Sequence, residues 1–432
     1  MGEEVQGMES GLDRRGSWNI MRMSHERRRF VLVSPVIGVL TLLAVGMVPD
    51  AAAEDVRSKQ WYLEAMEAEN LWKASTGEGI KVAVIDTGVS DTPSLEGRVR
   101  PGMDLSGMTG GPLDDYDSHG TTMAELIVGS GREGLKGLAP GAEVISFRAG
   151  LGKKFKGSTT SGIPEAIRAA ADSDARIINM SFTGKYLRPS EKKAVEYAQA
   201  KGKLMFAGVG NDAEKKNFIG YPAAYPNVIG VSAADKTGKV AKFSEYGEYV
   251  DLAAPGLDIP RWCDKTFRSY CDEGGGGTSS ATAIASASAA LVWSKRPDWT
   301  ANQVLRVLID TAGRDWPKDK PSDYLGYGLI RPARNVVKGE GKPGPADVDP
   351  ITNKKTVSVG SPGGDSPSDV STPAAPSQSP KEVASDGKGT SAAAQSSDDD
   401  SNNWLWPALG GLAVLVVIGG GASAAARARR RA

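Results

Sequence analysis

The stretch Ile80-Lys-Val-Ala-Val-Ile85, followed by Asp86-Thr87-Gly88, decides the fold class of this chain. A short run of mostly branched apolar residues that ends in a turn is typical of a strand buried on both faces of a parallel sheet. Similar runs recur at residues 143–147, 176–180, 204–207 and 228–231. We therefore predict a mostly parallel sheet with Asp86 at the carboxyl end of one strand, the edge where such sheets bind ligands.

Helical patterns between these runs supply the crossovers that parallel strands require. They cover residues 121–128, 164–171 and 189–200. A further helix is expected after Thr300, because Thr300 and Gln303 form a capping box ahead of apolar residues at helical spacing. The combination predicts a three-layer α/β sandwich in one large domain over residues 54–338.

The composition excludes a nucleic-acid binder held by a basic surface. The chain of 432 residues has 52 lysines and arginines and 52 acidic residues, so the formal charges cancel. Binding to nucleic acid comes mainly from neutralising phosphates with an excess of cations. We therefore expect no nucleic-acid partner.

The N-terminal end has the features of an export signal. Three arginines at residues 27–29 precede an apolar run at 30–48, and three alanines at 51–53 offer a cleavage site. We predict that residues 1–53 are an N-terminal extension and signal peptide. An uncleaved membrane anchor is the alternative, because the apolar run is long enough for one.

The C-terminal end predicts a single membrane span. Residues 404–426 carry no charge and are long enough to cross a bilayer as a helix. Arginines dominate the basic tail at 427–432, so the positive-inside rule places this tail in the cytoplasm and the folded domain outside. Residues 339–403 are rich in Ser, Pro, Gly and Asp and predict a disordered tether. We expect a single-pass protein of the cell membrane.

Cys263 and Cys271 are the only cysteines, and both fall in the part predicted to be exported. We predict a disulfide, which would stabilise the fold by roughly 2.5 kcal/mol through loop entropy. A metal-binding pair is the alternative, but no histidine or third cysteine lies nearby in the sequence to complete it. No cofactor or metal is predicted, although a structural calcium held by carbonyl oxygens would leave no sequence signature.

Four side chains could supply the parts of a nucleophilic mechanism. Ser279 follows Gly274-Gly-Gly-Gly277 at a predicted helix start. A serine hydroxyl becomes a nucleophile when a base takes its proton and an acid holds that base in one tautomer. His119 and Asp86 fit these roles, and Asn211 offers an amide to a developing oxyanion.

Each of these residues also has a plainer interpretation. A lone histidine is often structural, an aspartate often caps a turn, and a serine often caps a helix. Asp86-Thr87-Gly88 would also suit an aspartic protease, but that class needs a second such acid, which the sequence lacks. His25 lies in the predicted signal, so His119 is the one histidine available as a base in the exported domain.

The order of these segments resembles the subtilisin-like serine proteases, the subtilase or S8 family. The fragments that carry the resemblance are Val84-Ile-Asp86-Thr-Gly88, Ser118-His119-Gly-Thr121, Asn179-Met-Ser181, Gly210-Asn211, Tyr221-Pro-Ala-Ala-Tyr225-Pro226, Tyr249-Val-Asp-Leu-Ala-Ala-Pro255-Gly256 and Gly277-Thr-Ser279. It implies a subtilisin-like sandwich and a serine endopeptidase with Ser279 as nucleophile, His119 as base, Asp86 as its orienting acid and Asn211 as oxyanion donor.

The resemblance also implies where a polypeptide substrate would bind. A backbone wall would pair with it as an added strand, and a pocket would take the residue before the scissile bond. The wall residues are Ser181, Phe182, Thr183 and Gly184, and the pocket residues are Ala207, Gly208 and Gly220.

Within the family, the signal, short N-terminal arm, tether and C-terminal span most resemble the mycosins, the subtilases associated with type VII secretion in actinobacteria. This implies exported proteins as substrates and the membrane complex of that secretion system as a partner. One departure favours another hypothesis, since Ala283 stands where the family usually has proline. The alternative is a catalytically idle pseudoprotease that serves as a structural subunit of a secretion complex.

Overall fold

The structure is a computed structural model that describes residues 56–151, 162–272 and 274–356. The predicted signal peptide, the predicted transmembrane helix at 404–426 and the basic tail lie outside these ranges. Within the described ranges, none of the helices combines the length and the apolar character needed to span a membrane.

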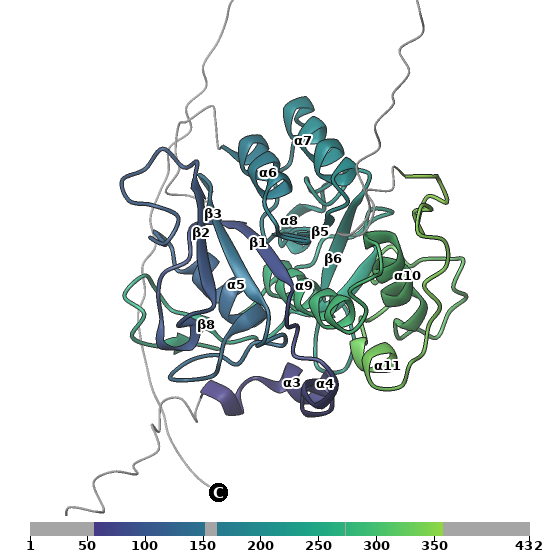
Figure 1. Cartoon of the computed structure of the whole chain (residues 1–432), viewed down its shortest axis with the longest axis horizontal. Coiled ribbons are helices and arrows are strands. Elements are labelled where there is room, and N and C mark those ends of the chain that lie inside the picture. The colour runs from purple at the N-terminus through teal and green to yellow at the C-terminus, as the bar shows by residue number, and fades with distance from the viewer. Residues whose placement is uncertain (1–55, 152–161, 273, 357–432) are drawn as a thin grey trace, which may run out of the picture. The chain divides into compact units, whose positions relative to one another are not determined.

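One seven-stranded sheet forms the centre of the fold, and every neighbouring pair of its strands is parallel (Figure 1). The strand order is β2-β3-β1-β4-β5-β6-β7. The strands are β1 (Lys81–Asp86), β2 (Val99–Asp104), β3 (Glu143–Arg148), β4 (Ile177–Met180), β5 (Leu204–Gly208), β6 (Val228–Ala234) and β7 (Leu252–Pro255). A separate antiparallel hairpin pairs β8 (Arg261–Trp262) with β9 (Tyr270–Cys271).

Helices cover both faces of the sheet, as the three-layer prediction requires (Figure 1). The longer ones are α5 (His119–Val128), α6 (Ile163–Asp172), α7 (Pro189–Ala200), α9 (Thr278–Lys295) and α10 (Ala301–Thr311). The short ones are α3 (Trp61–Ala65), α4 (Ala68–Ala74), η1 (Pro93–Leu95), α8 (Ala213–Lys216) and α11 (Pro332–Val336).

Alternate residues of β1 enter two different hydrophobic cores. Val82 and Val84 belong to the core that includes α5, α9 and α10, whereas Ala83 and Ile85 belong to the core beneath α6 and α7. Successive side chains of a strand point to opposite faces, so a strand covered on both sides is apolar throughout. The mostly apolar run at residues 80–85 therefore reflects a strand that is buried on both faces, as the sequence predicts.

The sheet contains two edge strands that the sequence analysis did not identify. Residues of β2 are mostly exposed and include Pro101 and Gly102, so this strand lacks the apolar run of a buried one. β7 is short and built mainly from small residues. The Thr300–Gln303 capping box at the start of α10 is confirmed.

The N-terminal arm packs at the end of α9 that lies away from Ser279. Ser75 Oγ donates to the carbonyl of Leu291 in the last turns of that helix, at 2.9 Å. Trp72 Nε1 donates to the carbonyl of Leu138, also at 2.9 Å, in the segment leading to β3. These bonds attach α4 to the scaffold.

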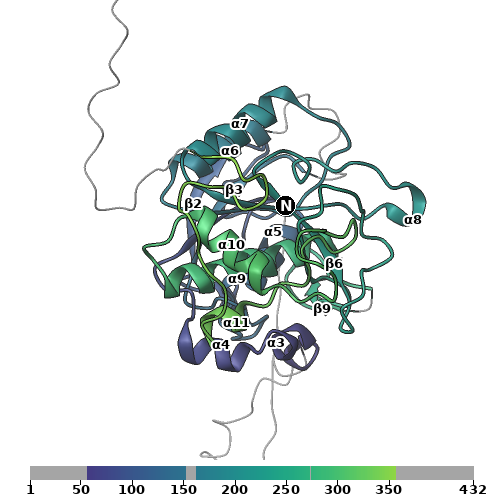
Figure 2. The same cartoon turned by 90° about the vertical axis from the view of Figure 1, so that its right-hand side faces the viewer.

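Residues 339–356, which the sequence predicted to be tether, are part of the folded unit and run past α10 (Figure 2). Asn302 Nδ2 donates to the carbonyl of Ala346 at 3.0 Å and to Thr356 Oγ1 at 2.7 Å. The Arg306 guanidinium donates to the carbonyl of Val348 at 3.0 Å. Polar side chains of α10 hold this segment by hydrogen bonds, and the amino-acid composition of residues 339–356 does not reveal such bonds.

We expect Asn302→Ala to lower the free energy of unfolding by about 1–3 kcal/mol, because it removes two hydrogen bonds worth about 0.5–1.5 kcal/mol each. Denaturant unfolding measures the change, and limited proteolysis should cut residues 339–356 faster. Lys354→Ala, at an exposed side chain of the same segment, serves as the control. Equal stability of Asn302→Ala and the unmodified protein would show that this attachment does not stabilise the fold.

Candidate active site

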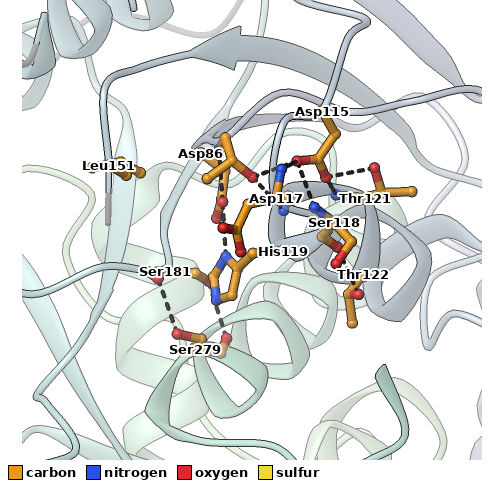
Figure 3. Close-up of polar contacts among 12 residues, drawn as sticks. Asp86, Asp115, Asp117, Ser118, His119, Thr121, Thr122, Leu151, Ser181 and Ser279 are labelled. Atoms are coloured by element: carbon orange, nitrogen blue, oxygen red, sulfur yellow. Dashed lines mark hydrogen bonds and ion pairs between the residues drawn. The ribbon is translucent and has the colours of Figure 1, made fainter. Parts of the chain in front are cut away.

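The buried Asp86 and the half-buried His119 form a pair at the carboxyl end of β1 (Figure 3). The Asp86 side chain is fully buried, and its Oδ1 lies 2.8 Å from His119 Nδ1. Oδ1 also accepts the backbone N–H of Thr87 at 2.8 Å. A carboxylate in this position keeps the proton of a neutral imidazole on Nδ1 and leaves Nε2 free to accept one.

Ser279 lies on the opposite side of the imidazole from Asp86 (Figure 3). It is the second residue of α9, directly after the glycine-rich run. Its Oγ donates to the carbonyl of Ser181 at 2.9 Å, and Ser181 Oγ donates to the carbonyl of Ser279 at 3.0 Å. These reciprocal bonds fix the start of α9 to the segment that follows β4.

Asn211 lies on the loop after β5 and faces the same helix start. Its Oδ1 accepts the backbone N–H of Thr278 at 2.9 Å, so the amide oxygen faces α9 and Nδ2 lies on the other side of the planar group. A Cβ on Gly277 would come within 3.2 Å of Nδ2, and Gly277 has φ 147°. The glycine therefore lets the backbone approach the amide.

The surroundings of His119 favour its protonated form. Burial lowers the pKa of His119, but the charge and hydrogen bond of Asp86, with the charges of Asp115 and Asp117, outweigh burial and raise it to about 9. Both the position and the basicity of the imidazole thus depend on nearby carboxylates.

Comparison with known proteins identifies the family. The profile described as "Subtilase family" matches residues 77–328, more than half of the chain. The chain is a subtilase. Subtilisin Savinase of Lederbergia lenta is 34% identical over 253 residues, which cover 58% of this chain and 88% of that protein. The thermophilic serine proteinase of Bacillus sp. strain AK1 is 39% identical over 192 residues, 44% of this chain and 47% of that protein.

Solved structures of mycosins are similar to this subtilase as well. The structure described as the MycP3 protease from the type VII (ESX-3) secretion system has 30% sequence identity and a TM-score of 0.55. The similarity covers 64% of this chain and 87% of the MycP3 chain. The resemblance predicted from the sequence is therefore confirmed for both the family and its mycosin members.

The predicted substrate wall of the subtilase lies beside Ser279. Gly184 pairs with Tyr221, its N–H donating at 2.7 Å and its carbonyl accepting at 2.8 Å. Because both backbone groups of Gly184 are used, an added substrate strand would have to pair with residues 181–183. Thr183 Oγ1 donates to the carbonyl of Gly208 at 2.7 Å, which joins the wall to β5.

The glycines of the predicted pocket are also required by close packing. A Cβ on Gly208 would come within 2.8 Å of Thr278 Oγ1, and one on Gly220 within 2.2 Å of the carbonyl of Val209. Ala207 precedes Gly208 in β5 and is fully buried. The absence of a side chain at Gly208 lets β5 pack against the start of α9, and the absence of one at Gly220 lets its segment pack against Val209.

The predicted disulfide is confirmed, and it closes a hairpin that docks on the helix of His119. Cys263 and Cys271 are bonded with their Cα atoms 5.1 Å apart. The backbone N–H of Trp262 donates to Thr122 Oγ1 at 3.2 Å, and the Tyr270 hydroxyl donates to Glu125 at 2.7 Å. No group of three or more potential metal-ligating His, Cys, Asp or Glu side chains occurs in the part of the chain that is described.

Asp115 is a site residue that the sequence analysis missed. Its carboxylate accepts the backbone N–H groups of residues 117, 118 and 121 at 2.8–2.9 Å. It also accepts the hydroxyls of Thr87 and Thr121 at 2.7 Å. These bonds hold Ser118, which has φ 81°, and so aim His119 at Asp86. The only sequence signal for Asp115 was its place four residues before His119, and position alone did not distinguish its role from that of Asp117.

We expect Asp86→Asn to lower the pKa of His119 from about 9 to its ordinary range or below, because burial remains while the closest carboxylate charge is lost. NMR titration of histidine-labelled protein measures this value, with His119→Ala assigning the signal. Asp117→Asn, which removes a more distant charge, should lower it less.

The Asp86–His119 pair should make the free energy of unfolding depend on pH. The folded-state pKa of about 9 exceeds the unfolded value of about 6.5, so the stabilisation is complete below pH 6.5 and is lost as pH rises to 9. Asp86→Asn should remove this decline from unfolding curves. An unchanged pKa and an unchanged decline would contradict the electrostatic role of Asp86.

Proposed function

We propose that this subtilase is a membrane-anchored, extracytoplasmic serine endopeptidase that cleaves peptide bonds through an acyl-enzyme and processes proteins exported by a type VII secretion system. The observation that carries the enzymatic part is the bond at 2.8 Å between His119 and the buried Asp86 carboxylate, with Ser279 on the other side of the ring. This arrangement fits the roles that nucleophilic catalysis by serine requires.

The reaction would use each of these groups in turn. Ser279 Oγ attacks the scissile carbonyl while the neutral form of His119 takes its proton at Nε2, and Asp86 stabilises the imidazolium that forms. The imidazolium then gives that proton to the leaving amine as the carbon–nitrogen bond breaks. Water, deprotonated by the same imidazole, hydrolyses the acyl-enzyme and restores the hydroxyl.

Negative charge on the carbonyl oxygen would be stabilised by Asn211 and by the start of α9. The Asn211 amide is oriented before the reaction by its bond to Thr278, so no reorganisation is needed when charge develops. The backbone N–H groups in the first turn of α9 carry the positive end of the helix dipole.

The cellular part of the proposal rests on two observations. MycP3, to which this chain is 30% identical, is described as a protease of a type VII secretion system. The sequence predicts an export signal before the domain and a membrane span after it, at residues 404–426. An anchored protease outside the cytoplasm would meet polypeptides as they leave the secretion complex.

The alternative of an idle pseudoprotease rests on Ala283 alone. Ala283 is fully buried inside α9, which continues without a break from Thr278 to Lys295. The absence of proline therefore leaves the helix that carries Ser279 regular, so the departure gives no reason for an inactive site.

A fluorophosphonate probe should form a covalent adduct on Ser279, because only a serine beside a functional base attacks phosphorus rapidly. Mass spectrometry of the labelled protein locates the adduct. Ser279→Ala should remove it, and His119→Ala should slow its formation by at least about a thousandfold. A folded protein that forms no adduct would contradict the enzymatic proposal and favour the idle alternative.

Asn211→Ala should lower kcat by about 10²–10³ while changing KM little, because the amide meets full charge only in the transition state. This factor was measured for the oxyanion asparagine of subtilisin, a member of the same family. Kinetics on a quenched fluorescent peptide measure both constants.

Asn217→Ala is the matched control for this prediction. Asn217 lies on the same loop but bonds to the backbone of Tyr246 through both its amide groups, at 2.9 and 3.0 Å. Its loss should affect local stability rather than turnover. A fall in kcat no larger for Asn211→Ala than for Asn217→Ala would rule out the oxyanion role.

A further inference from the structure

Glu245 places a fully buried carboxyl group against the loop that carries Asn211. The side chain has no exposed surface, and its backbone N–H donates to the carbonyl of Gly210 at 3.0 Å. A Cβ on Gly210, which has φ 123°, would lie 2.1 Å from Glu245 Oε2. The carboxyl thus occupies the space beside the residue that immediately precedes Asn211.

Few groups in the described part of the chain can compensate a negative charge on Glu245. Neither Oε1 nor Oε2 of Glu245 has a hydrogen-bond partner there. The charged and titratable groups that face it are Asp212, Lys185 and Tyr249. Lys185 is shared, because its Nζ lies 3.6 Å from Asp212 Oδ2. An ionised carboxylate without a partner is costly in such a place, so the group is expected to hold its proton.

The electrostatic surroundings agree with this geometry. Burial and the charge of Asp212 raise the pKa of Glu245 to about 8, against the opposing effects of the Lys185 charge and the nearby backbone N–H of Asp212. At neutral pH the loop therefore packs against an uncharged acid. Above about pH 8 the Glu245 carboxyl group in this space carries a negative charge.

A charge at this place would act directly on the proposed reaction. The oxyanion would develop beside Asn211, one residue from the Gly210 backbone that Glu245 contacts. Two like charges close together in a poorly solvated site repel strongly, and their repulsion would be greater in the transition state than in the ground state. An ionised Glu245 would also lose the neutral packing that fixes the loop.

We propose that Glu245 is a positioning residue that holds the Gly210–Asn211 loop as a neutral acid, and that its ionisation suppresses turnover at alkaline pH. This inference rests on the proposed protease function, because it acts on the oxyanion that peptide cleavage creates. Glu245 itself does not touch the reacting atoms, so its effect is exerted by its charge and by its packing against the Gly210–Asn211 loop.

The test is the ratio of kcat for Glu245→Gln to kcat for the unmodified full-length protein, measured from pH 6 to pH 10 on one quenched fluorescent peptide. Glutamine keeps the shape of the neutral acid and cannot ionise. We expect a ratio near 1 below pH 7 that rises to about tenfold or more above pH 9. Titration of His119 affects both proteins alike and cancels in the ratio.

Asp212→Asn provides an independent variant on the same loop. Asp212 raises the pKa of Glu245, so removing its charge should move the alkaline fall in kcat to lower pH. The double variant Asp212→Asn/Glu245→Gln should lack the fall. Asp212→Asn tests the same inference if Glu245→Gln does not fold, because it leaves Glu245 in place.

The outcomes separate this inference from the function on which it rests. Turnover with a flat Glu245→Gln ratio, or an alkaline fall that Asp212→Asn leaves unmoved, would overturn the role of Glu245 and leave the protease function standing. Absence of both turnover and a Ser279 adduct in the unmodified protein would overturn the protease function and this inference together.

Discussion

The bond between the buried Asp86 carboxylate and His119 is the interaction on which the rest of the site depends. A carboxylate without exposed surface is stable only if it is paired, so the fold must deliver an imidazole to the end of β1. The chain achieves this by starting α5 at His119, directly after a residue with φ 81°. Asp115 holds that start by accepting several hydrogen bonds, so one buried acid positions the partner of another.

Glycines allow the two helices of the site to come close to the sheet. A Cβ on Gly120 would lie 2.1 Å from the carbonyl of Gly88 and 3.0 Å from the Cβ of Asp86, so only glycine lets α5 begin against β1. Gly277 has the same function for α9, where the backbone passes the Asn211 amide. The precision of the site therefore comes from backbone packing in the sheet and helices, with long side chains adding little to it.

The sequence predicts the parts of this structure that depend on local pattern. Apolar runs located the central strands, the capping box located α10, and the motifs around Asp86, His119, Ser279 and Asn211 indicated residues that the fold does bring to one edge. The features that could not be predicted from the sequence depend on tertiary contacts. Asp115 and Glu245 matter because of what surrounds them, and residues 339–356 belong to the fold because α10 binds them through polar side chains that composition does not register.

The low polarity of the site has opposite consequences on its two sides. On the histidine side, burial alone would lower the pKa of His119, and three carboxylates are needed to reverse this. On the oxyanion side, burial outweighs the opposing effect of Lys185 at Glu245 and keeps that acid neutral, with the charge of Asp212 adding to the effect of burial. Electrostatic stabilisation of a transition state requires a site from which water is excluded, and every ionisable group in such a site must then be paired or uncharged. The fully buried Asp86 carboxylate is paired with His119, whereas the fully buried Glu245 carboxyl is uncharged, so burial accounts for the state of both acids.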